Sequence, residues 1–91
     1  MEFDWDERKA AHNVTKHSVP FTEAATVFYD PLSMTYEDPD HSMGEDRYIT
    51  IGLSGQGRLL IVSHADQGYV IRLISARLAT KRERKLYESG R

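Results

Sequence analysis

Apolar positions recur at helical spacing in the first third of the chain and at every second position in its middle. In the helical part, Asp6 can cap a helix that runs to about His17. Val19-Pro20 ends that helix, because proline has no amide hydrogen with which to continue it. Thr22 is expected to cap a second, shorter helix over residues 23–28.

From Leu32 onward the apolar residues alternate, which is typical of strands. Two alternating runs, residues 32–36 and 47–53, are followed by two mainly apolar runs, residues 58–64 and 69–75, which are also predicted to be strands. Turns at residues 54–57 and 66–68 join the last three runs, so an antiparallel meander is the simplest topology. The last two runs are apolar on both faces, which predicts central strands covered by helices on at least one side.

A third helix is predicted near the C-terminus, where Thr80 and Glu83 stand at the two positions of a capping box and Gly90 marks the end. Phe3-Asp4-Trp5 is expected to be a short extended start. With 91 residues and 40% hydrophobic content, the chain can bury one modest core, so we expect a single domain over residues 1–91. The predicted fold class is α+β, with two N-terminal helices, an antiparallel four-stranded meander sheet and a C-terminal helix.

Composition narrows the compartment in which the chain is expected to work. It has no cysteine, so neither disulfides nor thiolate metal sites are available, and we expect a cytoplasmic protein. No stretch approaches the roughly 20 apolar residues that span a bilayer. The first residues are acidic where a signal peptide would be basic, so the sequence predicts neither a membrane anchor nor export.

The formal net charge of -2 conceals an uneven distribution of charge along the chain. Residues 1–46 hold three Lys and Arg against eleven Asp and Glu, whereas residues 47–91 hold nine against three. A basic C-terminal half can hold phosphates electrostatically. A solvated charge pattern without a polyanionic partner accounts for the same counts equally well.

Several arginines on the predicted strands point to phosphate chemistry. Arg58 and His64 share one parity, so both project from the same face of their strand. Arg72 lies inside an apolar run, where a guanidinium is costly unless it is paired or reaches solvent, and Arg77 follows at the strand end. Pairing with the acidic N-terminal half is the other interpretation of each arginine.

RNA can be cut without a metal ion when its 2′-hydroxyl attacks the adjacent phosphorus, a route that needs a base, an acid and cations. Arginine suits the cationic role, because its fork binds two phosphate oxygens at once. We therefore expect Arg58, Arg72 and Arg77 to converge on one exposed patch and hold the phosphate, while His64 or Glu83 moves protons. Helix capping is the alternative role for Glu83.

RNA-binding residues are predicted on two helices. Lys9, Asn13, Lys16 and His17 lie at helical spacing on the first helix and form a polar stripe that can meet phosphates or a partner; of these, Lys9, Lys16 and His17 are the predicted RNA-binding residues. Lys81 and Arg82 begin the third helix and are included in the same prediction. A plain solvated face also accounts for the stripe on the first helix, and His12 is most simply part of that surface.

Two other functions fit parts of the sequence. Asp38, Asp40 and His41 bring two carboxylates and an imidazole together, as in a metal-dependent nuclease, although Asp and Pro in this order are first of all turn residues. The second alternative is a binding module without catalysis, whose acidic N-terminal half docks a basic partner. The sequence contains no P-loop, dinucleotide fingerprint or nucleophile elbow.

The order and spacing of several segments resemble the BrnT family, the toxin component of type II toxin–antitoxin systems. The likeness covers nearly the whole chain. It is carried by Phe3-Asp4-Trp5-Asp6, Lys9, Asn13, Lys16-His17-Ser18-Val19, Phe21, Glu23-Ala24-Ala25, Val27-Phe28-Tyr29-Asp30-Pro31, Tyr48-Ile49-Thr50-Ile51-Gly52, Ile71-Arg72-Leu73-Ile74-Ser75-Ala76-Arg77, Glu83 and Tyr87.

This resemblance implies a RelE-like ribonuclease fold and growth arrest through cleavage of RNA, with no cofactor. It also implies neutralisation by a BrnA-type antitoxin, a ribbon-helix-helix protein, in a heteromeric complex. Among the candidate site residues, the resemblance favours Arg58, Arg72 and Arg77.

Overall fold

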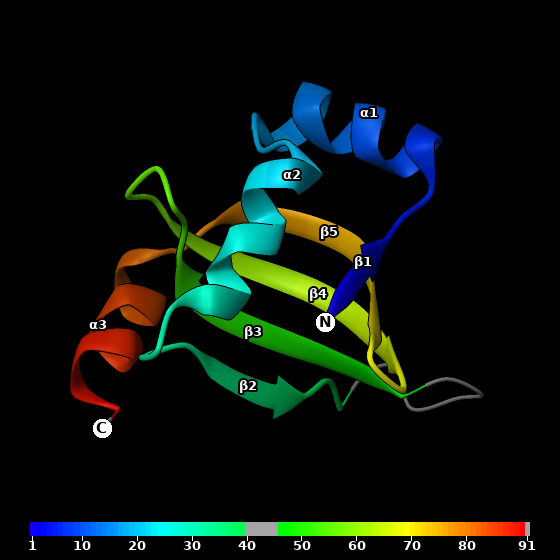
Figure 1. Cartoon of the computed structure of the whole chain (residues 1–91). Helices are drawn as coiled ribbons and strands as arrows, with labels where there is room; N and C mark the ends of the chain where they lie inside the picture. The colour runs from blue at the N-terminus through cyan, green and yellow to red at the C-terminus, as the bar shows by residue number, and fades with distance from the viewer. Residues whose placement is uncertain (40–45, 91) are drawn as a thin grey trace.

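Within the described residues, five strands form a single mixed sheet in the order β1-β5-β4-β3-β2 (Figure 1). The structure is a computed structural model and describes residues 1–39 and 46–90. The strands are β1 (Glu2–Asp4), β2 (Met34–Glu37), β3 (Arg47–Leu53), β4 (Leu59–Gln67) and β5 (Val70–Leu78). The helices are α1 (Glu7–His17), α2 (Phe21–Ala24), the 3-10 helix η1 (Ala25–Tyr29) and α3 (Lys81–Ser89).

The prediction of a purely antiparallel, four-stranded sheet is wrong, because the extended start of the chain is a fifth strand. β1 pairs with β5 in parallel, with Phe3 opposite Ile71, and so forms one edge of the sheet. Burial of Phe3 holds it there, since its ring packs 5.4 Å from that of Phe28. Three residues are too few to show alternation, and their partner strand lies almost seventy residues away in the sequence.

The second N-terminal helix also differs from the prediction over residues 23–28. It begins at Phe21, with Pro20 instead of Thr22 as its N-cap, because the Pro20 carbonyl accepts from the amides of Glu23 and Ala24. After one turn it tightens into η1. The Thr26 hydroxyl donates to the Glu23 carbonyl at 2.6 Å, which is the kind of local bond that competes with regular α-helix.

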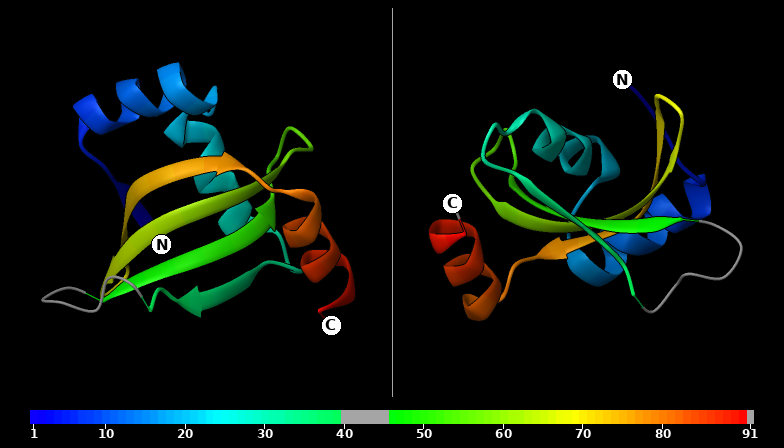
Figure 2. Two further views of the ribbon diagram at one scale, coloured as in Figure 1. Left: turned by 180° about the vertical axis from the view of Figure 1, so that it is seen from behind. Right: turned by 90° about the horizontal axis from the view of Figure 1, so that it is seen from below.

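The two faces of the sheet are covered differently, as Figure 2 (right) shows. The main core lies on the face covered by α2 and η1, here called the α2 face, where Phe21, Ala24 and Val27 pack on Leu60, Val62 and Leu73. The opposite face, here called the α3 face, has a smaller cluster around Ile51, Leu59 and Ile61, against which Tyr87 of α3 packs. The helix α3 lies at one end of the sheet and covers only that part of the α3 face (Figure 2).

The hairpin between β4 and β5 is tighter and longer than the sequence predicts. A two-residue turn at Gly68 and Tyr69 joins the strands, and Gly68 supplies the positive φ of 70° that such a turn requires. The register is shifted between Ser63 and His64, so Ile74 has no partner on β4. This bulge re-aims the middle of β5 at the point where α1 lies beside it.

Candidate functional site

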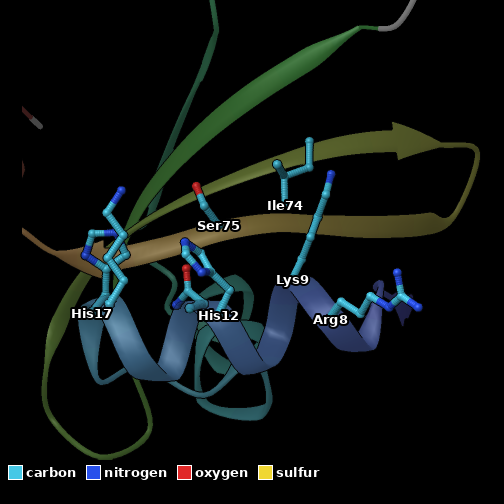
Figure 3. Close-up of a pocket in the computed structure, with 8 residues that line it drawn as sticks. Arg8, Lys9, His12, His17, Ile74 and Ser75 are labelled. Carbon is cyan, nitrogen blue, oxygen red and sulfur yellow. The ribbon is translucent and has the colours of Figure 1, made fainter.

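A basic groove of about 350 Å³ lies between α1 and the middle of β5 (Figure 3). Lys9, His12 and His17 project from α1 toward β5, and Ser75 lies across the groove from them. The residues that line it are Arg8, Lys9, His12, Asn13, Lys16, His17, Ile74 and Ser75. The structure thus brings together the predicted RNA-binding residues of α1 and adds two strand residues beside them.

Asn13 holds the two walls of this groove together. Its side-chain amide donates to the carbonyls of Val19 and Ala76, at 2.9 and 2.8 Å, and its oxygen accepts from the Ala76 amide at 3.0 Å. β1 ends opposite Arg72 and no longer pairs with β5 at Ala76. The buried Asn13 side chain therefore supplies hydrogen-bond partners for the Ala76 amide and carbonyl at this place. The position of α1 beside β5 depends on these bonds.

The groove gathers the positive charge of an otherwise acidic half of the chain. Arg8, Lys9 and Lys16 are the three Lys and Arg residues of positions 1–46, and all three line it. Within residues 1–39 and 46–90, no ion pair or side-chain hydrogen bond engages the side chains of these cations or of the two histidines. Concentrated, unpaired positive charge is the electrostatic footprint of a phosphate-binding surface.

Two of the predicted arginines, Arg72 and Arg77, lie on β5 and project on the α3 face. Arg77 pairs with Ile61, which belongs to the α3-face cluster. Arg72 pairs with Ala65, whose neighbour on β4, His64, points to the α2 face. Arg72 pairs with Asp4 at 2.6 Å, with 38% of the arginine side chain and 53% of the aspartate exposed. Exposed pairs of this kind are weak, so a phosphate can compete for the guanidinium.

Arg77 and Glu83 form a two-pronged ion pair at the start of α3. Both guanidinium Nη atoms donate to the Glu83 carboxylate at 2.8 Å, and the Thr80 amide donates to the same carboxylate at 2.9 Å. The hydrogen bonds from Arg77 are the main reason that the pKa of Glu83 falls to about 2. The predicted capping box is confirmed, and Glu83 is a permanently ionised carboxylate at neutral pH.

Arg58 does not join the other two arginines, because it lies on the opposite face of the sheet. Its Nε and Nη2 donate to Glu23 of α2 at 2.9 and 2.6 Å, and Nη2 also donates to the Ser18 carbonyl at 3.0 Å. The Glu23 side chain is only 2% exposed, and its hydrogen bonds from Arg58 lower its pKa. Arg58 thus neutralises a buried carboxylate and ties α2 to the end of α1.

His64 is buried on the α2 face and cannot meet a substrate there. Its Nε2 lies 2.8 Å from the Thr50 hydroxyl and its Nδ1 lies 2.7 Å from Asp66. The imidazole also packs edge-on against Phe28 and stacks with Tyr48. Burial lowers the pKa of His64 despite the nearby Asp66, which favours a neutral ring that is part of the core.

The remaining predicted residues are placed as follows. Lys81 and Arg82 are exposed in the first turn of α3, away from the α1 groove. Asp38 is described, whereas Asp40 and His41 lie outside the described residues. In the part of the chain that the structure describes, no group of three His, Cys, Asp or Glu residues could hold a metal ion.

Sequence reasoning missed Arg8 as a groove residue and gave Asn13 and His12 no separate role. Asn13 did stand in the predicted stripe with Lys9 and Lys16, and that stripe was the available signal. Neither the bulge in β5 nor the place of α1 at its edge leaves a local pattern in the sequence. No helix among the described residues has the length and apolar character that would let it cross a membrane.

Comparison with known proteins places this arrangement in a family. The chain is similar to a ribonuclease toxin, BrnT, from Brucella abortus, whose crystal structure superimposes with a TM-score of 0.69 at 21% identity and covers 89% of this chain and 99% of that one. No curated protein is a significant match. The profile of a family described as "Ribonuclease toxin, BrnT, of type II toxin-antitoxin system" matches residues 5–83. The chain therefore belongs to the BrnT family of ribonuclease toxins.

Proposed function

We propose that this toxin is an endoribonuclease that needs no metal ion and binds RNA along the α1 groove and the α3 face. The observation that carries the proposal is the groove, where all the Lys and Arg residues of the acidic N-terminal half meet beside β5. Polyanion binding is driven by such local charge and tolerates a negative total charge. Arg72 and Arg77 extend the positive surface along the same strand.

The chemistry proposed is attack of the 2′-hydroxyl on the neighbouring phosphorus. Arg72 and Arg77 stand five residues apart on β5, roughly 16 Å along the strand, so each would contact a different phosphate of the RNA. Each keeps about two fifths of its side chain exposed beside its carboxylate partner. Lys9, Lys16 and His17 in the groove, with Lys81 and Arg82 on α3, would contact the RNA backbone. Arg58 and His64 would act by holding the fold together.

A partner is proposed on the strength of the family. A type II toxin works with a protein antitoxin, and the resemblance of this chain to BrnT proteins supports a BrnA-type, ribbon-helix-helix antitoxin in a heteromeric complex. Cleavage of RNA in the cytoplasm would arrest growth, and binding of the antitoxin would prevent it.

Incubation of the purified chain with RNA in EDTA tests the metal-independent reaction. We expect cleavage at the same rate with and without the chelator. The upstream product should end in a 2′,3′-cyclic phosphate and the downstream product should begin with a 5′-hydroxyl. Products that form only after a divalent cation is restored would overturn metal independence. A complete lack of products under both conditions would favour a binding module without catalysis.

Two variants in the same assay separate the roles of Arg72. Arg72→Ala should slow cleavage by about 10- to 100-fold, as expected for loss of a charge-assisted phosphate contact, and should relieve growth arrest. Asp4→Asn removes the ion pair and keeps the guanidinium, so it should cleave at least as fast as the parent. Equal loss of activity in both variants would mean that only the ion pair matters.

A further inference from the structure

Proton transfer in RNA cleavage requires groups that titrate near neutral pH and reach the substrate. Neither of the groups that the sequence suggested does both. Glu83 is held ionised by Arg77 and Thr80, with its pKa lowered to about 2, so it is a poor acid. His64 is 1% exposed, and both of its ring nitrogens already have partners.

The groove holds two imidazoles that a docked substrate can reach. His12 and His17 project from α1 into it, as Figure 3 shows, and no described side chain occupies their ring nitrogens. Imidazole is the side chain whose ordinary pKa, about 6.5, lies closest to neutral pH. The described part of the chain contains three histidines, and these two are the ones open to a docked phosphate.

Their spacing suits an in-line displacement. Five residues of α-helix separate the two Cα atoms by about 7.5 Å along the axis. In such a reaction the attacking and leaving oxygens lie on opposite sides of phosphorus, and each needs its acid or base within roughly 2.6–3.2 Å. One imidazole on each side of a docked phosphate therefore requires a separation of several ångströms, which the helix provides.

The surroundings of the two imidazoles favour an anion between them. Arg8, Lys9 and Lys16 supply positive charge from α1, and Ile74 and Ser75 on the β5 wall are uncharged. No carboxylate lines the groove. A phosphodiester that enters it meets cations and two groups able to exchange protons, and Asn13 fixes both walls.

We propose that His12 and His17 are the general base and general acid of RNA cleavage in the α1 groove, an inference that rests on the proposed ribonuclease function. One neutral imidazole takes the proton of the 2′-hydroxyl as the O2′–P bond forms. The other, as imidazolium, gives its proton to O5′ as the P–O5′ bond breaks. The products are a 2′,3′-cyclic phosphate and a 5′-hydroxyl, and the two histidines regain their starting states through solvent.

Single-turnover cleavage of an RNA oligonucleotide by the full chain and its variants tests this assignment. His12→Ala and His17→Ala should each slow cleavage by about 100- to 10,000-fold, the usual contribution of a general acid or base. Binding of a 2′-O-methyl RNA of the same sequence, which cannot react, should change much less. Added imidazole should restore part of the activity, and the bell-shaped dependence of the parent rate on pH should lose one limb in each variant.

Charge-preserving variants separate proton transfer from simple electrostatics. His12→Arg and His17→Arg keep a cation in the groove and remove the titrating group, so they should be as slow as the alanine variants. Parent-like cleavage by either arginine or alanine variants, while the parent itself cuts RNA, would overturn the assignment. If the parent cuts no RNA, the proposed function fails first. A circular dichroism spectrum like that of the parent shows that each variant is folded.

Discussion

At the scale of single residues, the arginines of this chain divide by the partner that each one holds. Arg58 pairs with the buried carboxylate of Glu23 on α2, whereas Arg72 and Arg77 pair with carboxylates that remain partly exposed to solvent. The residue type is the same, but the exposure of the partner decides whether a phosphate can replace it. Exposure depends on the fold and cannot be obtained from the alternation of residues along a strand.

The Arg77–Glu83 pair makes stability depend on pH in a predictable direction. The pKa of Glu83 is lowered from 4.5 to about 2 in the folded chain, so the contribution is complete above pH 4.5 and is lost as the pH falls toward 2. Glu83→Gln should remove that part of the dependence. The test is the free energy of unfolding, measured by denaturant titration from neutral to acidic pH.

The parent should lose more stability than the Gln variant over this acidic range, and the two curves should converge at its lower end. Parallel curves for the two proteins would contradict the role assigned to the pair. Glu23, whose pKa Arg58 also lowers, remains in both proteins, so the difference between them belongs to Glu83.

At the scale of elements, the sequence predicts what repeats locally and misses what depends on a distant partner. β3, β4 and β5 are seven to nine residues long and contain runs that either alternate or are mainly apolar, and α1 and α3 have recognisable caps at Asp6 and Thr80. β1 has three residues, and only the distant β5 makes it a strand. The second helix was misplaced because Pro20 begins it and Thr26 helps to tighten it.

The contact between α1 and β5 should depend strongly on Asn13. Asn13→Ala leaves one buried amide and two carbonyls without their partner, so the free energy of unfolding should fall by roughly 2–4 kcal/mol. Thr15→Ala is a matched control on the same helix. Its exposed hydroxyl bonds only to Ala11 one turn away, and alanine is the better helix former.

Denaturant titration of both variants measures the difference. A loss below about 1 kcal/mol for Asn13→Ala would mean that packing alone positions the helix. The same variant should also weaken RNA binding, because the groove loses its fixed width.

At the scale of the whole molecule, a net negative chain presents a positive surface because the fold collects charges that are dispersed in the sequence. Counting Lys and Arg by halves predicted a basic C-terminal region. It did not predict that the few cations of the acidic half would meet beside β5. That meeting requires the bulge in β5 and the Asn13 bonds, neither of which is visible in composition.

The affinity for RNA should therefore depend on salt through the groove. The logarithm of the association constant should fall linearly with the logarithm of salt concentration, since bound phosphates release counterions. The double variant Lys9→Gln, Lys16→Gln should reduce the slope by about 1.4, at roughly 0.7 for each phosphate contact on a single strand. Fluorescence anisotropy with a 2′-O-methyl RNA measures both slopes, and an unchanged slope would exclude these lysines from the interface.

The parallel pairing of β1 with β5 has a consequence for how the toxin is made. The two strands and the Asn13 contact to Ala76 join the first residues of the sequence to a segment that is synthesised some sixty to seventy residues later. A polypeptide that stops before Val70 contains both groove histidines but has no β5 against which α1 can pack. Both walls of the groove therefore exist only once residues as far as Ala76 have been made, and a shorter product lacks the groove that we propose for RNA.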